Sequence, residues 1–331
     1  MPLRPFKLPA DLPVIIDLIP PTFQYPENEE WNVQADEMEG MVDTFKGVRR
    51  IWPLLRLIKL ISPPMRDVLR GYIWEEDGKP VGLTNIMRQG ATDRWYIGNV
   101  AVLPDYRRRG IARKLVEACV QYAREHGAKG ITLDVVSGNL PAYTLYEQLG
   151  FDHYSSQSEL MYEADGQVGE MPMPEGYEIR LMPMFDWKPR YELSKRVIPE
   201  AVQKYTPVEE GRFRQPLVVR WLMPIFWRAT GTRPAAFGVF RAADQQLVAT
   251  ALITVRTRAG GTCNVSFILD PAHAVVAPAL VRHALREIQQ ASPGRRIESA
   301  IPDYYGEVIA AALEAGFTRR WDHCTMGMLV E

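Results

Sequence analysis

One segment of the sequence has residue types that could hold a phosphate ester, the basic glycine turn YRRRGIAR at positions 106–113. The apolar run NVAVLP precedes it, and a helical pattern follows it. Gly110 permits a close approach of the backbone to an anion, and Ala112 keeps the next position small. Free N–H groups at the start of a helix favour negative charge, so the turn indicates a diphosphate site. A solvated run of charge is the competing explanation.

A second motif lies downstream, in the segment from Asn139 to Phe151. It reads N-x-x-A-x-x-L-Y-x-x-x-G-F, with Tyr146 at its centre. The order of strand, R-x-x-G-x-A turn, helix, strand and this second motif resembles the GNAT superfamily of acetyl-CoA-dependent N-acetyltransferases. The resemblance covers about residues 70–163. Ala112 stands where glycine is commoner in that family.

The resemblance implies a site for acetyl-CoA. In the family the pantetheine arm pairs with the strand before the turn as an added strand would, and the turn surrounds the pyrophosphate. The asparagine of the second motif contacts the cofactor, although an asparagine at a strand end can also cap a turn. The cofactor-binding residues that the resemblance implies are Val100, Ala101, Val102, Arg107, Arg108, Arg109, Gly110, Ile111, Ala112, Arg113 and Asn139.

Two residues are implied as catalytic. Tyr146 matches the tyrosine that protonates or hydrogen-bonds the leaving thiolate, although its apolar helical stripe also suits a core position. Many members carry a glutamate on the strand before the turn, but Gly98 stands there with Asn99. Asp134 matches a proton acceptor of the ribosomal-protein N-terminal acetyltransferases, and a solvated strand residue is its alternative. Other carboxylates on the expected acceptor side are Glu27, Glu29 and Glu30.

The pattern around these motifs alternates short strands and helices. Apolar residues at helical spacing predict a helix over 111–125, ended near Gly127. The remaining elements predicted in the first half are strands at 71–75, 81–87, 95–103, 131–136 and 151–163 and a short helix ending at Gly150. The same order returns in the second half, with strands at 235–241, 246–256, 262–269 and 297–300 and helices at 276–290 and 305–315.

This repetition predicts an internal duplication with about 160 residues in each copy. The second copy has the turn AHAVVA at 272–277, without arginine or glycine, and Ala312 and Tyr305 at the tyrosine and asparagine positions. We therefore expect a degenerate copy that does not bind the cofactor. The predicted domains are 1–163, a linker at 164–176 and 177–331. The predicted fold class is α+β, with two tandem GNAT-like domains, each a mixed, mostly antiparallel sheet flanked by helices.

Composition excludes several classes. The 331 residues carry a formal net charge of −1, so an overall electrostatic attraction to nucleic acid is absent. The three cysteines, Cys119, Cys263 and Cys324, form no disulfide or zinc pattern, and no metal is expected. No signal peptide or apolar run long enough for a membrane span is seen, which predicts a cytoplasmic protein. The segment 49–70 is basic and apolar, which would suit a membrane-surface helix, but its prolines interrupt such a helix. The resemblance implies that helices over the acceptor cleft lie here.

The function expected from the motifs is direct transfer of an acetyl group from acetyl-CoA to an amine, because no cysteine sits beside a histidine to act as a relay nucleophile. A non-catalytic acyl-CoA sensor or scaffold is the alternative. The amine could belong to a peptide or to a small molecule, and a closed pocket lined by Trp31, Trp52 or Trp95 would favour the latter. A homodimer is left open.

Overall fold

The computed structural model describes residues 2–25, 28–61, 70–164, 166 and 168–330, without the side chains of 30 and 58–61. The chain divides into two compact units. The first comprises Met1–Tyr154, Lys204–Pro207 and Cys324–Glu331, and the second comprises Ser155–Gln203 and Val208–His323.

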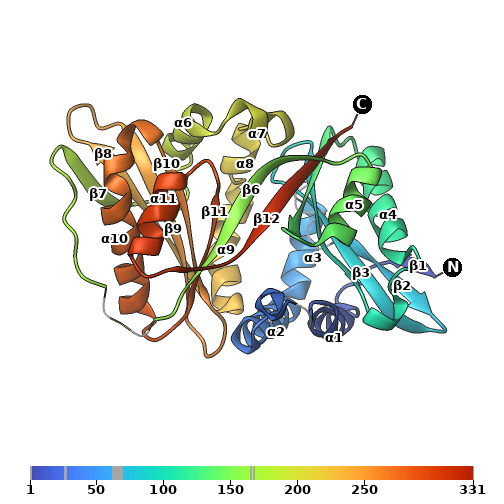
Figure 1. Ribbon diagram of the computed structural model, residues 1–331. Coiled ribbons are helices and arrows are strands. Elements are labelled where there is room, and N and C mark those ends of the chain that lie inside the picture. Colours follow the sequence, from blue (N-terminus) through green and yellow to red (C-terminus); the bar gives the residue numbers. More distant parts are fainter. Residues whose placement is uncertain (1, 26–27, 62–69, 165, 167, 331) are drawn as a thin grey trace. The chain divides into compact units, whose positions relative to one another are not determined.

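The first unit contains a mixed sheet with helices packed against it (Figure 1). Strands β1 to β4 are antiparallel neighbours, β5 runs parallel to β4, and the end of β12 lies beside β5. Its elements are β1 (Leu3–Pro5), α1 (Leu12–Thr22), α2 (Ala35–Arg50), α3 (Trp52–Ile61), β2 (Arg70–Glu76), β3 (Lys79–Arg88), β4 (Arg94–Val102), α4 (Ile111–Glu125), β5 (Gly130–Val136) and α5 (Leu140–Gln148).

Helix α4 has the bounds that the apolar spacing predicts. Its buried face includes Ile111, Leu115 and Cys119, which recur at intervals of four residues, and it packs against β2, β3 and β4. Gly127, with φ +74°, follows the helix in the left-handed conformation that glycine adopts at helix ends. The sheet and α4 thereby fix the direction of the turn at 106–113.

The second unit repeats this plan. Strands β7 to β10 are antiparallel neighbours, β11 runs parallel to β10, and β6 pairs antiparallel with β11. The elements of the second half, with β6, are β6 (Asp152–Tyr162), β7 (Tyr177–Met182), α6 (Lys188–Val197), α7 (Glu200–Tyr205), α8 (Glu210–Phe213), α9 (Leu217–Thr230), β8 (Thr232–Arg241), β9 (Leu247–Arg256), β10 (Cys263–Leu269), α10 (Ala277–Ala291), β11 (Ile297–Pro302), α11 (Gly306–Glu314) and β12 (Thr318–Leu329). The predicted fold class is confirmed.

The compact units do not coincide with the predicted segments 1–163 and 177–331. Leu160 and Tyr162 of β6 are buried in the core of the second unit, where β6 pairs with β11. Met326 and Met328 of β12 are buried in the core of the first unit. Each half thus supplies a strand end to the other unit's core. Alternating apolar residues predict that one face of a strand is buried. They do not predict which of the two units the strand joins.

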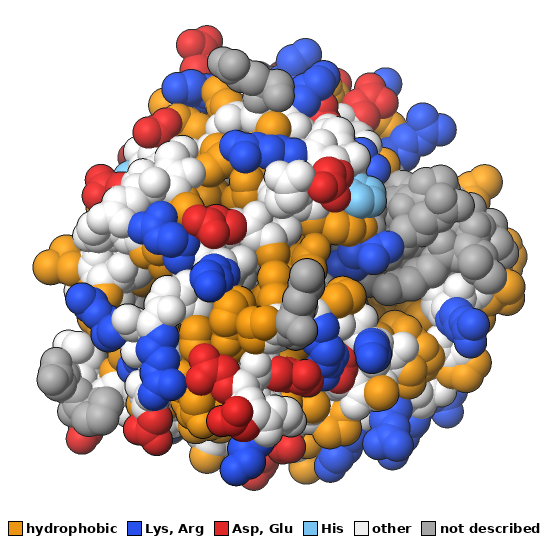
Figure 2. Space-filling view, turned by 90° about the vertical axis from the view of Figure 1, so that its right-hand side faces the viewer, with side chains coloured by type: hydrophobic (Ala, Val, Ile, Leu, Met, Phe, Trp, Pro, Cys, Tyr) orange, Lys and Arg blue, Asp and Glu red, His pale blue; other side chains and the backbone are white. Residues whose placement is uncertain are grey.

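The segment 49–70 is described in part. Helix α3 begins at Trp52 with Pro53 in its first turn, a position that tolerates proline because its N–H would be unpaired in any helix. Pro63 and Pro64 lie outside the described residues. In the part of the chain that the structure describes, no helix is long and apolar enough to cross a membrane. On the face in Figure 2, basic and acidic side chains alternate without a large field of one sign.

A buried ion pair ties β1 to the start of α1. Two nitrogens of the Arg4 guanidinium donate to the Asp11 carboxylate, over 2.8 and 3.0 Å. Burial raises the pKa of Asp11, but the hydrogen bonds from Arg4 and from the Lys7 amide outweigh it, and the net shift is downward. A carboxyl whose pKa falls on folding stabilises the fold above its unfolded pKa, and this contribution is lost as the pH falls through the folded pKa.

We expect Asp11→Asn to lower the free energy of unfolding by about 2 kcal/mol at pH 7, because it removes one of the two carboxylates that pair with the half-buried Arg4 and leaves only Glu75. Urea denaturation at pH 7 and again in acid measures the effect, and the difference from wild type should shrink in acid. Asp17→Asn, an exposed position on the same helix, should change little. Equal losses for the two variants would contradict this role of Asp11.

Candidate functional site

A cavity of about 600 Å³ lies in the first unit where the end of β4, the turn before α4 and the start of α5 meet. It brings together most of the predicted site residues, which the sequence separates by up to 46 positions from Val100 to Tyr146. The predicted residues that line it are Val100, Val102, Arg107, Arg108, Gly110, Ile111, Ala112, Arg113, Asn139 and Tyr146. Ala101, Arg109 and Asp134 do not line it.

One edge of β4 is unpaired beside the cavity. The parallel register between β4 and β5 runs from Arg94 opposite Gly130 to Ile97 opposite Leu133, although both strands continue beyond it. On its other edge β4 pairs with β3 as far as Val102, with an irregularity where Asn99 has φ +50°. In the described register, the backbone groups on one edge of the last residues of β4 therefore have no strand partner. An extended ligand could pair with them.

The turn before α4 presents unpaired N–H groups. Gly110 is the N-cap residue, with φ +77°, and a Cβ added to it would meet nothing within 4 Å. The first helical turn contains no acidic residue. The first backbone amides of a helix have no partner within the helix, so this turn can accept an anion.

The arginines around the turn have different surroundings. Arg107 donates to the carbonyl oxygens of Val102 and Thr22, over 3.2 and 2.9 Å, and so holds the turn to β4 and α1. Arg109 points to Glu76, with 3.3 Å between Nη1 and Oε2. Arg108 lines the cavity and makes no hydrogen bond or ion pair with another described residue. Arg108 is therefore the arginine most available to an anion.

Tyr146 closes one side of the cavity from α5. Its side chain is only 5% exposed. Burial, and to a lesser degree the phenol of Tyr25, raises its pKa, so the group is a neutral O–H donor at physiological pH. The Asn139 side chain accepts from the Ala142 amide over 3.3 Å, so Asn139 caps α5 as well as lining the cavity.

Asp134 is hydrogen-bonded to a second tyrosine, Tyr96, which belongs to neither sequence motif. The Tyr96 hydroxyl donates to Asp134 Oδ2 over 3.1 Å. Burial raises the pKa of Tyr96 most, followed by the charge of Asp134, and the phenol of Tyr146 contributes in the same direction. Tyr96 therefore contacts Asp134, one of the two predicted catalytic residues.

The side of the cavity formed by the segment between α1 and α2 is aromatic. Tyr25 and Trp31 line it and form an edge-to-face pair with ring centroids 5.4 Å apart. Trp31 is a predicted lining residue, whereas Trp95 is fully buried in the core and Trp52 does not line the cavity. Tyr25 lies in a region without a motif. Only its closeness in sequence to Trp31 could have predicted that it lines the cavity.

The three glutamates that the sequence offers as alternative proton acceptors are not supported as such by the structure. Glu29 does not line the cavity, Glu27 lies outside the described residues, and the side chain of Glu30 is not described. Among the described residues there is no group of three or more His, Cys, Asp and Glu side chains that could hold a metal ion.

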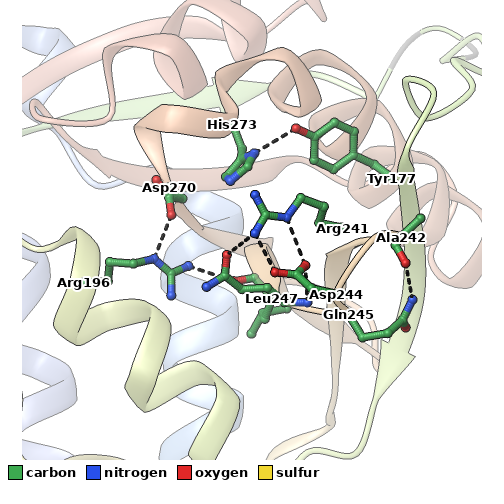
Figure 3. A network of polar contacts seen from close by, with 10 residues as sticks. Tyr177, Arg196, Arg241, Ala242, Asp244, Gln245, Leu247, Asp270 and His273 are labelled. Carbon is green, nitrogen blue, oxygen red and sulfur yellow. Dashed lines mark hydrogen bonds and ion pairs between the residues drawn. The ribbon is translucent and has the colours of Figure 1, made fainter.

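Asp270 and Arg196 lie together in a network of polar contacts just before the corresponding turn of the second unit (Figure 3). Asp270 caps the 3-10 helix Pro271–Val276, where its carboxylate accepts from the Ala272 amide over 3.1 Å. The same carboxylate accepts from Arg196 Nε over 2.8 Å. Asp270 therefore lies before the turn, whereas the start of α10 itself has Val276 at its N-cap and no side-chain cap.

Comparisons with known proteins agree with this geometry. Residues 42–151 match the model of the acetyltransferase (GNAT) family. The chain is 38% identical over 68 residues to N-alpha-acetyltransferase 30 of Schizosaccharomyces pombe, covering 20% of this chain and 45% of that protein. It is 33% identical over 79 residues to the [ribosomal protein bS18]-alanine N-acetyltransferase of Escherichia coli, covering 24% and 53%. The chain thus spans about half the length of these curated relatives.

Solved structures match over the whole chain. A tandem GNAT protein from the clavulanic acid biosynthesis pathway superimposes with a TM-score of 0.65 at 16% identity, covering 99% of this chain and 98% of that one. A GCN5-related N-acetyltransferase from Sphaerobacter thermophilus gives a TM-score of 0.64 at 15% identity, covering 99% and 95%. At these identities the likeness establishes the fold, two GNAT-like domains in tandem.

Proposed function

We propose that the chain transfers an acetyl group directly from acetyl-CoA to an amine, because residues 42–151 match the model of the acetyltransferase (GNAT) family. One observation carries this proposal. A single cavity joins an unpaired strand edge, an uncapped helix start beside Arg108 and a buried phenol, Tyr146. These are the three features needed to hold an extended arm, a diphosphate and a leaving thiolate.

The described residues fit the parts of acetyl-CoA. The backbone from Val100 to Val102 would pair with the pantetheine arm, and the amides after Gly110 would hold the pyrophosphate with Arg108. Bound acetyl-CoA supplies an acetyl group activated as a thioester. The second unit, whose turn AHAVVA at 272–277 has neither arginine nor glycine, would not bind the cofactor.

The proposed residues account for the two proton transfers. As the amine nitrogen bonds to the acetyl carbon and the C–S bond breaks, Tyr146 donates its hydroxyl proton to the departing sulfur. Asp134, which accepts a hydrogen bond from Tyr96, would take the proton released by the amine nitrogen. Reprotonation of Tyr146 and loss of the proton from Asp134 to water restore the site.

A glutamate in the family's usual place would not fit this chain without adjustment. A Cβ added to Gly98 would lie 3.1 Å from Tyr96 Cε1 and 3.3 Å from the Asn85 amide. This crowding supports a base at Asp134. It also favours the second candidate function, an acyl-CoA sensor that binds the cofactor and transfers nothing.

The proposal is tested by measuring both binding and turnover. Isothermal titration calorimetry should show one acetyl-CoA bound per chain. Release of the CoA thiol should then exceed the amine-free rate with at least one member of a panel of peptide N-termini, lysine side chains and small primary amines. Binding without turnover on the whole panel would favour the sensor, and the absence of binding would contradict both functions. The panel also decides between a peptide and a small-molecule acceptor.

We expect Asp134→Asn to lower kcat by about 30-fold, somewhat less than the roughly 100-fold or more that a general acid or base typically contributes. The carboxylate leaves while the shape of the side chain stays, so the Kd for acetyl-CoA should not change. Asp93→Asn is the matched control, because it makes the same change at a carboxylate that does not line the cavity. Asp93 pairs with Lys129 just before β5, the strand that carries Asp134. A wild-type kcat for Asp134→Asn in steady-state kinetics would remove Asp134 from the mechanism.

A further inference from the structure

Polar side chains gather on one face of the sheet in the first unit, the face turned away from α4. Tyr96 in β4 and Asp134 in β5 each lie between two residues that are buried in the core shared with α4. Asn85 in β3 lies between Ile86, which belongs to the same core, and Thr84, which contacts α4. Successive side chains of a strand point to opposite faces, so the three polar side chains share the other face.

Asn99 joins this face through an irregularity in β4. Its φ is +50°, and the register with β3 shifts beside it. Bulges of this kind redirect a side chain. The Asn99 side-chain nitrogen Nδ2 donates to Asn85 Oδ1 over 2.7 Å. Asn99 is exposed, and its own Oδ1 makes no hydrogen bond to another described residue. The Asn85–Asn99 pair thus holds one carboxamide in place and leaves its oxygen open to a ligand.

The Asn85–Asn99 pair and Asp134 lie on opposite sides of Gly98. Asn85 is the partner of Gly98 in the register of β3 with β4. On the other edge of β4, Gly98 and Asp134 each follow directly on the last residue pair of the register with β5. A Cβ added to Gly98 would lie 3.3 Å from Nδ2 and Oδ1 of Asn85 and 3.1 Å from Cε1 of Tyr96, which donates to Asp134. An amine nitrogen that approaches Gly98 on this face would have an amide on one side and a carboxylate on the other.

The acetyl group of the bound cofactor would lie beside these groups. Asn99 directly precedes Val100, which lines the cavity and whose backbone is proposed to pair with the pantetheine arm. Val100 packs against the core shared with α4, whereas Asn99 lies with Asn85 on the opposite face. We propose that the Asn85–Asn99 pair orients the acceptor of the transfer, a primary amine, by accepting one of its N–H groups at Asn99 Oδ1. The inference rests on the proposed function, because it needs the thioester and the proton acceptor Asp134.

A neutral primary amine has two N–H groups, and the groups on the two sides of Gly98 can use both. As the nitrogen bonds to the acetyl carbon and the C–S bond breaks, one N–H proton passes to Asp134 and the sulfur takes the proton of Tyr146. The second hydrogen stays on the nitrogen, bonded to Asn99 Oδ1, and remains in the amide product. A neutral secondary amine has only the hydrogen that it must give to Asp134. The pair should therefore favour primary over secondary amines.

The test compares the best primary amine of the panel with its N-methyl counterpart, and the preference is the ratio of their kcat/KM values. Asn99→Gly removes the carboxamide at a φ that glycine adopts readily. Asn99→Asp keeps an oxygen acceptor there, and Asn85→Leu removes the partner of Asn99 at similar volume. Gln245→Gly is the matched control, because Gln245 has a similar φ of +59° in the second unit.

We expect Asn99→Gly to lower kcat/KM for the primary amine by about three- to tenfold, the effect of one hydrogen bond, and to leave the N-methyl amine nearly unchanged. The Kd for acetyl-CoA should stay the same. Asn99→Asp should keep the preference, and Asn85→Leu should lower it. The double variant should lose no more preference than Asn99→Gly alone, because Asn85 acts only through Asn99. Gln245→Gly should match wild type.

An unchanged preference in Asn99→Gly, with or without a common loss for both amines, would overturn the proposal, since a merely structural role does not distinguish the two. A loss of preference in Asn99→Asp as large as in Asn99→Gly would also overturn it, because the oxygen acceptor is kept there.

A second measurement needs no turnover. The side-chain amide resonance of Asn99, assigned by its absence in Asn99→Gly, is followed by NMR in the CoA-bound chain. It should shift with the primary amines of the panel and not with their trimethylammonium counterparts, which have no N–H group. If no amine is acetylated, the proposed function fails, but this shift still decides whether the pair binds amines. The absence of the shift with every primary amine would overturn the inference.

Discussion

Gly110→Asp should weaken acetyl-CoA binding by about 100-fold or more. Most of this loss should come from repulsion between the new carboxylate and the pyrophosphate. At an effective dielectric constant of 20, two unit charges about 5 Å apart repel by about 3 kcal/mol, which corresponds to a factor of about 100. The carboxylate would enter the turn at the start of α4, where the amides and Arg108 are proposed to hold the pyrophosphate. Isothermal titration calorimetry measures the change in Kd directly.

Gly110→Asn is the matched control, because it has nearly the same shape without the charge. The space around the Cβ position is open, so neither side chain meets a neighbour there. The φ of +77° is unfavourable for both, and asparagine and aspartate tolerate that region better than most residues do. Gly110→Asn should therefore cost less than about tenfold in Kd, the equivalent of about 1.4 kcal/mol. Equal losses for the two variants would mean that backbone strain, not an anion, explains the glycine.

The elements that depend on local pattern could be predicted from the sequence. Helix α4 has the predicted bounds because its apolar spacing and its final glycine act within one segment. The turn and the Tyr146 motif were predicted together because their spacing along the chain is characteristic of a known family. The cavity that joins them confirms that these residues lie close together, while their roles remain predictions.

What could not be predicted depends on contacts between distant segments. Nothing in the spacing of β6 indicates that its second part pairs with β11 rather than with a strand of the first unit. Tyr96 alternates with Trp95, and the sequence does not show which of the two lies beside the predicted carboxylate. The structure buries Trp95 in the core and places Tyr96 on Asp134. Tyr205 is a still clearer case, because its partner Asp152 is 53 positions away.

The other large effect is expected at Tyr146, where Tyr146→Phe should lower kcat by about 100- to 1,000-fold, as the loss of a general acid does. The phenol is held neutral by burial, so its proton is available to the sulfur at all physiological pH values. The ring itself packs against Phe151 and would stay in place, with centroids 6.3 Å apart. The Kd for acetyl-CoA should therefore change little while kcat falls.

Tyr143→Phe separates this role from a general effect of removing a phenol from α5, because Tyr143 lies on the same helix but does not line the cavity. It should keep a kcat within about twofold of wild type, since phenylalanine retains the partly buried ring that packs against the core and against His153. A leaving group that needs no proton offers a second comparison. If Tyr146 acts as the acid, an acetyl thioester of a more acidic thiol should lose much less rate in Tyr146→Phe than acetyl-CoA does. Equal losses with both thioesters would make Tyr146 a packing residue, the alternative that its apolar stripe also allows.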